Sequence, residues 1–124
     1  MSTTSVEWVR ETSNNRWPDL TTLNLEDPRF DEAQGVFIVF HGGEQPGIVC
    51  VGEGRLREQL KTVAHDARVL AFEKSHLYVA WAKAKEDERL GIEKYLSQRL
   101  MPKVSGESAD VEPISVNLPW KKTS

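Results

Sequence analysis

The stretch from Gly35 to Leu60 constrains the fold most, because it contains two short strands, a turn and a helix in direct succession. Its sequence is GVFIVFHGGEQPGIVCVGEGRLREQL. Residues 36–40 form an unbroken β-branched and aromatic run, and residues 41–46 supply the Gly-Gly and Pro of a hairpin loop. Residues 48–51 are then the returning strand, and Gly52 and Gly54 are expected to end it.

A helix is predicted from Arg55 onward. Its apolar residues Leu56, Leu60 and Val63 recur at spacings of four and three, which places them on one helical face. A strand that ends in glycines at the start of a helix exposes backbone N–H groups, and an anion can bind there. We therefore expect an anion near Gly52, Gly54 and Arg55.

The second half of the chain repeats the strand-then-helix order. Residues 77–84 alternate apolar with smaller or polar side chains, which predicts a third strand. A helix follows from residues 83–89, with acidic residues in its first turn, and ends near Met101 because Pro102 cannot continue it. The tail beyond is rich in Ser, Gly and Pro, with apolar residues that suggest a strand-like segment packing back. The pattern predicts a small α+β domain.

Length and composition indicate one domain. With 124 residues, 39% of them hydrophobic and 28% charged, the chain matches an ordinary globular protein. No apolar run has membrane-spanning length and the polar start does not resemble a secretory signal, so we expect a cytoplasmic protein without a membrane partner. Cys50 is the only cysteine, which excludes an internal disulfide and a multi-cysteine zinc site.

Residues 1–34 are interpreted as an acidic, extended arm packed on a domain formed by residues 35–124. The arm has three Arg or Lys residues against seven Asp or Glu, and one helical turn is expected at residues 27–30. Its acidity could shield a basic surface, although a solvated arm is the simpler interpretation. Its large apolar side chains should hold it against the domain.

The charge of the remaining residues bears on nucleic-acid binding. Residues 35–124 have thirteen basic against twelve acidic residues, so they lack the excess of cations that tight DNA binders use. A local basic ridge remains, formed by Arg57 and Lys61 one helical turn apart, with Arg55 before them. Together with Gly52, Gly54 and His41, these residues are the candidates for contacting DNA.

Several of these features resemble the GIY-YIG domain of structure-specific endonucleases and homing nucleases. The resemblance rests on the tripeptides at residues 35–37 and 50–52, the glycines and helix after them, and the pattern from Glu93 to Pro102; it covers about residues 35–105. It implies a three-stranded antiparallel sheet flanked by helices. In that family a tyrosine from each tripeptide, an arginine on the first helix, a glutamate on a later helix and a downstream asparagine act on one phosphodiester.

The resemblance assigns positions in this chain to that site. Glu93 matches the glutamate, which in the family holds a divalent metal, here expected to be Mg²⁺ or Mn²⁺. Phe37 and Cys50 stand at the tyrosine positions, and Gln59 stands where the arginine is expected. Phe37 has no hydroxyl to move a proton, and a neutral amide stabilises phosphate charge less than a guanidinium does. Ser105 falls where an asparagine is common, and Asn117 is the only downstream asparagine.

Three functions follow from this pattern. The preferred hypothesis is a catalytically degenerate nuclease-like domain that acts as a nucleic-acid-binding or regulatory module. The second is an active metal-dependent endonuclease with a rearranged site of His41, Arg57, Tyr95 and Glu93. The third is a protein-interaction domain without a nucleic-acid role. A non-functional interpretation of Glu93, an ion pair with Arg89 four residues earlier, is equally compatible with the sequence.

Overall fold

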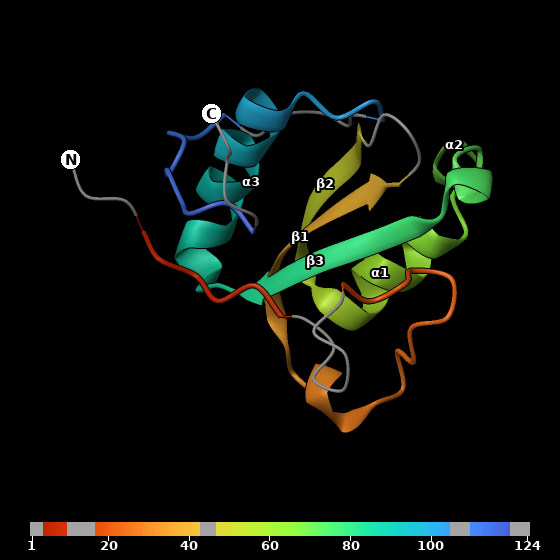
Figure 1. Ribbon diagram of the computed structural model, residues 1–124. Coiled ribbons are helices and arrows are strands. Elements are labelled where there is room, and N and C mark those ends of the chain that lie inside the picture. Colours follow the sequence, from red (N-terminus) through yellow and green to blue (C-terminus); the bar gives the residue numbers. More distant parts are fainter. Residues whose placement is uncertain (1–3, 10–16, 43–46, 105–109, 120–124) are drawn as a thin grey trace.

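A three-stranded antiparallel sheet forms the centre of the computed structural model (Figure 1). The structure describes residues 4–9, 17–42, 47–104 and 110–119. Strands β1 (Gln34–His41), β2 (Gly47–Arg55) and β3 (Leu77–Lys83) lie in the order β2-β1-β3. The predicted α+β class and antiparallel sheet are confirmed, and most of the expected hairpin loop, residues 43–46, lies outside the described residues.

The helices follow the strands in the predicted order. Helix α1 (Leu56–Ala64) comes directly after β2, the short α2 (Ala67–Leu70) and a 3-10 turn, η2 (Glu73–Ser75), lead to β3, and α3 (Glu86–Leu100) follows β3. Met101 adopts a left-handed conformation after α3, immediately before Pro102. The helical turn expected in the arm is η1 (Pro28–Phe30), and the N–H of Arg29 within it donates to the side chain of Asp27.

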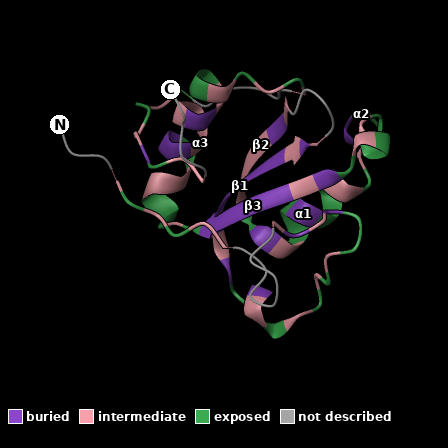
Figure 2. Cartoon of the chain, viewed as in Figure 1, coloured by how far each residue is buried: buried purple, intermediate pink, exposed green. Residues whose placement is uncertain are grey.

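Each face of the sheet is covered by one helix and forms its own apolar core. Side chains alternate along β1, so Phe37 and Val39 pack on the α1 side while Val36 and Ile38 pack on the α3 side. Leu60 from α1 and Leu96 from α3 are fully buried against these faces. Figure 2 shows that β1 and β3 are buried over most of their length, whereas most of β2, at the edge of the sheet, is half-buried.

Strand β2 is longer than the sequence predicts. The expected end at Gly52 and Gly54 is wrong, because both glycines pair with β1 and the strand continues to Arg55. Gly54 has a φ of 126°, a conformation that side-chain-bearing residues rarely adopt, which lets the strand pass directly into α1. The N–H of Leu56, at the start of α1, donates to the carbonyl of Ala33. This amide therefore cannot also hold the expected anion.

The segments at the two ends of the chain lie against the sheet and against each other. Val9 and Asp19 form single bridges with β3, so the arm covers parts of that outer edge. The tail returns as predicted: Val116 is buried and bridges Thr4. The last residues of this tail, 120–124, lie outside the described residues. Among the described residues, no helix is long and apolar enough to cross a membrane.

Candidate functional site

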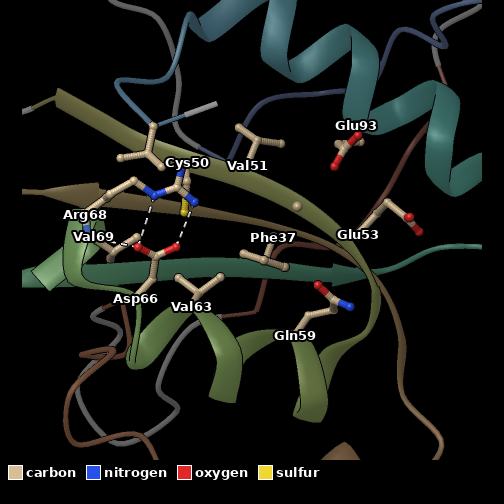
Figure 3. A pocket seen from close by; sticks show the side chains of 12 residues that line it. Phe37, Cys50, Val51, Glu53, Gln59, Val63, Asp66, Arg68, Val69 and Glu93 are labelled. Atoms are coloured by element: carbon tan, nitrogen blue, oxygen red, sulfur yellow. Dashed lines mark hydrogen bonds and ion pairs between the residues drawn. The ribbon is translucent and has the colours of Figure 1, made fainter. Parts of the chain in front are cut away.

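A pocket of about 350 Å³ lies at the outer edge of β2, between α1 and α3 (Figure 3). The segment after α3 covers the first part of this edge, where the amides of Lys103 and Val104 donate to β2 carbonyls. The pocket therefore occupies the later part of the strand. Its lining residues come from β1, β2, α1, the α2 region, α3 and the segment after α3: Phe37, Cys50, Val51, Gly52, Glu53, Gln59, Val63, Asp66, Arg68, Val69, Glu93 and Val104.

The four positions assigned from the family resemblance all line this pocket. Phe37 projects from β1 at its centre, Cys50 lies on β2, Gln59 rises from α1, and Glu93 reaches down from α3 (Figure 3). Their sequence separation is large, so only the fold brings them together. Their role in binding or catalysis stays a prediction.

Phe37 forms the floor of the pocket and packs directly on Gly52. The two residues are partners across β1 and β2, and a Cβ atom added to Gly52 would lie 2.3 Å from Cζ of Phe37. No side chain fits between the ring and the strand. Gly52 is thus required by packing against Phe37.

Cys50 is a buried thiol rather than a reactive one. Burial raises its pKa to about 12, and the nearby Asp66 carboxylate adds to the effect. The thiolate is the nucleophilic form of cysteine, so this group is inert at neutral pH.

Among the residues that the structure describes, no cation forms an ion pair with Glu93. Burial, followed by repulsion from Glu53, raises the pKa of its carboxyl above the usual value. The expected ion pair with Arg89 does not form. Arg89 instead places Nε 3.2 Å from Oε2 of Glu53 and hydrogen-bonds the side chain of Gln34. The pocket wall formed by Glu53 and Glu93 is therefore acidic.

The sequence-based prediction missed an ion pair at the opposite end of the pocket. Arg68 donates from Nε and Nη2 to the two carboxylate oxygens of Asp66, at 3.2 and 3.0 Å. Asp66 also accepts from the backbone N–H of Arg68 and caps α2, and the bonds from Arg68 lower the pKa of its carboxyl. In a sequence, an Asp two residues before an Arg indicates only a local turn. That Asp66 and Arg68 line the pocket depends on where α2 packs, which the sequence does not show.

The predicted basic ridge faces the acidic arm instead of the pocket. Arg57 donates to the carbonyls of Leu25 and Asp27 at 2.6 and 3.0 Å, and pairs with Asp31 at 2.7 Å. The ammonium group of Lys61 lies 2.6 Å from the carboxylate of Glu26.

The remaining candidates also lie apart from the pocket lining. Arg55 is the N-cap residue of α1 and lines a separate, smaller hollow. His41 lies at the far end of β1, where its ring stacks on Phe72 and its Nδ1 contacts the carbonyl of Gly42. Tyr95 packs partly buried on the α3 side of the sheet. The rearranged set of His41, Arg57, Tyr95 and Glu93 is therefore not assembled.

Asn117 does not reach the site either. Its side chain accepts from the N–H of Val6 and donates to the Val6 carbonyl, at 2.8 and 3.0 Å. It connects the two terminal segments. Ser105, the other candidate for the family's asparagine, lies outside the described residues.

The residues present make a poor metal site. Within the described part of the chain, no group of three or more His, Cys, Asp or Glu side chains could hold a metal ion. Mg²⁺ can be bound through one or two carboxylates when substrate phosphates supply further oxygens. The described lining has three carboxylates, those of Glu53, Asp66 and Glu93. Glu53 already pairs with Arg89 and Asp66 with Arg68.

Comparison with protein-family models, curated proteins and solved structures finds no match for this chain.

Proposed function

We propose that this protein is a GIY-YIG-like domain that has lost phosphodiester cleavage and acts as a binding or regulatory module. The observation that supports the proposal is the convergence of Phe37, Cys50, Gln59 and Glu93 on one pocket. These are the four positions that the family resemblance selects, and three of them hold groups unsuited to the chemistry.

The chemistry of each position favours binding over cleavage. Phosphoryl transfer needs a positioned nucleophile and cationic groups aimed at the phosphate oxygens. Phe37 cannot take a proton, Cys50 is protonated at neutral pH, and Gln59 has no charge. A phosphate entering the pocket would meet the carboxyl group of Glu93, which no described cation pairs with and whose negative charge repels it.

Any binding of DNA should be weak and sensitive to salt. Arg57 and Lys61 form the basic ridge that could contact DNA. Both already form ion pairs with carboxylates of the arm. DNA must compete with these ion pairs, and each phosphate contact that forms adds to the salt dependence. A regulatory role through a protein partner is compatible with the same geometry.

The decisive experiment is a cleavage assay with Mg²⁺ or Mn²⁺ on linear and branched DNA. We expect no cleavage above background by the unmodified protein or by Glu93→Ala. Glu86→Ala is the matched control, because Glu86 is an exposed glutamate on the same helix and lies outside the pocket lining. Metal-dependent cleavage that is lost in Glu93→Ala and kept in Glu86→Ala would establish an active nuclease instead.

A second measurement separates the nucleic-acid role from a purely protein-binding role. Fluorescence anisotropy with labelled DNA should show binding that weakens as salt increases and weakens further in Lys61→Ala. Absence of binding even at low salt would favour the protein-interaction domain.

A further inference from the structure

The outer edge of β2 is open where it borders the pocket. At the other edge of the sheet the arm covers β3, where the N–H of Leu20 donates to the carbonyl of Leu77 at 2.9 Å. The segment after α3 covers the first part of β2, where the N–H of Val104 donates to the carbonyl of Val49 at 2.7 Å. Beyond Val49, no described residue pairs with the outer side of β2.

The pairing of β1 shows which backbone groups of β2 face this open edge. The carbonyl of Gln34 points toward β3, because it accepts from the N–H of Ala84 at 3.1 Å. Backbone groups alternate in direction along a strand, so Phe37, three residues later, points toward β2 and bonds its partner Gly52. The residues on either side of Gly52 must then point their backbone groups outward.

These two residues, Val51 and Glu53, present backbone N–H and C=O groups at the uncovered edge. None of these groups has a hydrogen-bond partner among the residues that the structure describes. Both residues are half-buried and both line the pocket. An uncovered strand edge is a template for another strand, and an extended peptide that pairs with it supplies the missing partners.

The charge beside this edge selects the partner. The side chains of Val51 and Glu53 lie on the α3 side of the sheet, from which Glu93 also enters the pocket (Figure 3). The other carboxylates of the lining are already in ion pairs, whereas no described cation pairs with Glu93. A half-buried carboxylate is stabilised by an opposite charge nearby. A partner with a cationic side chain therefore complements this edge.

An antiparallel strand would bring such a side chain to the correct face. In antiparallel pairing, residues directly opposite each other place their side chains on the same face of the sheet. A residue opposite Val51 or Glu53 would direct its own N–H and C=O toward β2 and its side chain toward α3. A lysine or arginine at that position could bond the strand and reach Glu93 together.

Two other occupants fit less well. A second copy of the chain, paired through the same edge, would bring the Glu93 carboxyl groups of two molecules toward each other, and like charges at an interface are unfavourable. The phosphates of DNA would meet the same carboxyl group.

We propose that residues 51–53 bind an extended peptide as an added antiparallel strand, with a lysine or arginine of the peptide paired to Glu93. This partner rests on the binding role proposed above for the same pocket, and it identifies what the pocket binds.

The test is an NMR titration of the ¹⁵N-labelled full chain with the blocked peptide acetyl-Thr-Val-Lys-Val-Thr-amide. We expect saturable shifts of the Val51 and Glu53 amide signals and slower hydrogen exchange at both, because their protons gain acceptors. The amide of Val79 is the internal control, since it already donates to the carbonyl of Pro18 at 2.9 Å on the other edge of the sheet.

Methylating the peptide backbone tests strand pairing without changing the protein. A methyl group on the backbone nitrogen of the lysine removes a donor directed at β2 and should weaken binding by roughly ten-fold. A methyl group on the backbone nitrogen of the following valine, which points away from β2, is the matched control and should have little effect.

Recognition of charge is tested with one protein variant and its control. Glu93→Gln should weaken binding of the lysine peptide by about five-fold, the upper end for exposed ion pairs, because Glu93 is half-buried. A peptide with glutamine in place of lysine should bind both proteins equally. Glu86→Gln changes an exposed glutamate of the same helix outside the pocket lining, and should leave lysine-peptide binding unchanged. Circular dichroism confirms that both variants are folded.

Three results of the titrations would overturn the proposed partner. They are a lack of saturable response at Val51 and Glu53, equal weakening by the two methyl groups, and equal binding of the lysine peptide to Glu93→Gln and the unmodified protein. Shifts of the same amides on concentrating the protein alone would assign the edge to a second copy, and shifts caused by duplex DNA would assign it to nucleic acid.

The cleavage assay keeps this proposal distinct from the loss of cleavage. Failure of the peptide to bind, with no cleavage of DNA, would remove the peptide partner and leave the loss of cleavage standing. Metal-dependent cleavage would overturn the loss of cleavage whether or not the peptide binds.

Discussion

Gly52 illustrates how packing at a single residue shapes the pocket. The Phe37 ring occupies the space that a side chain at position 52 would need, so the pocket floor there is the face of an aromatic ring. Around it, Glu93 contributes negative charge, while Glu53 pairs with Arg89 and Asp66 pairs with Arg68. The contacts of these individual residues therefore explain both the shape of the pocket and its charge.

Replacing Gly52 by alanine should destabilise the protein. The added methyl group collides with the Phe37 ring, and overpacking of this kind costs about 1–3 kcal/mol. The free energy of unfolding from urea denaturation measures this change. In a Phe37→Leu background the same substitution should cost less, since a smaller side chain leaves room for the methyl group. Equal costs in the two backgrounds would show that the ring is not the obstacle.

Glu93→Gln should stabilise the protein at neutral pH. The raised pKa means that the folded state holds the Glu93 proton more tightly than the unfolded chain does. Stability therefore falls as the pH rises from the usual glutamate value of 4.5 through the raised pKa, and stays lower above it. Glutamine removes this loss.

The urea concentrations at the midpoint of unfolding, measured for both proteins at neutral pH and below pH 4.5, check the sign of this effect. The advantage of Glu93→Gln over the unmodified protein should be present at neutral pH and absent at the acidic pH. Glu86→Gln, an exposed change on the same helix, provides the control. An advantage of Glu93→Gln that persists unchanged at acidic pH would contradict the burial and repulsion argument.

At the scale of elements, the contact between α1 and the arm matters most for the predicted DNA surface. Arg57 joins the helix to two backbone carbonyls and one carboxylate of residues 25–31, and its side chain is 25% exposed. Lys61 adds a more exposed ion pair one turn later. The basic ridge is thus part of the attachment of the arm to the domain.

Arg57→Ala should lower the free energy of unfolding by about 2–3 kcal/mol, because it removes charge-assisted hydrogen bonds and leaves partly buried carbonyls unpaired. Arg57→Lys should restore only part of the loss, since one ammonium cannot reproduce the fork of a guanidinium. Urea denaturation provides the measurement.

Glu26→Gln is the control for this contact. It breaks only the exposed pair with Lys61 and should leave stability almost unchanged. If Arg57→Ala were as mild as Glu26→Gln, the arm would not depend on Arg57 for its attachment.

At the scale of the whole molecule, the two terminal segments stabilise each other. Asn117 pairs with both backbone groups of Val6, and its carbonyl accepts from Nε1 of Trp8. The tail also contacts α3, where the N–H of Ile114 donates to the carbonyl of Gly91. The contacts of Asn117 with Val6 and Trp8 join residues more than a hundred positions apart in the sequence.

Asn117→Ala should cost about 1–2 kcal/mol, the typical value of two hydrogen bonds. The Val6 amide should then exchange its hydrogen faster, as measured by NMR. Asn117→Asp should have a smaller effect on Val6 exchange, because aspartate keeps the acceptor and loses only the donor. Unchanged exchange at Val6 in Asn117→Ala would mean that this link does not hold the arm.

The sequence by itself determined the elements and their order. Alternating and helical spacings are local properties, so the strands, α1 and α3 could be predicted from residues near one another, and so could the end of α3 before Pro102. The family resemblance also selected Phe37, Cys50, Gln59 and Glu93, and all four line one pocket.

Only the tertiary structure decided which partners the charged and polar groups take. Arg57 hydrogen-bonds to Leu25 and Asp31, which lie 32 and 26 positions earlier in the sequence. Asn117 hydrogen-bonds to Val6, which lies 111 positions earlier. No local pattern encodes such pairs, because they depend on how separate segments pack. The same reason hid the location of the Asp66–Arg68 pair at the pocket.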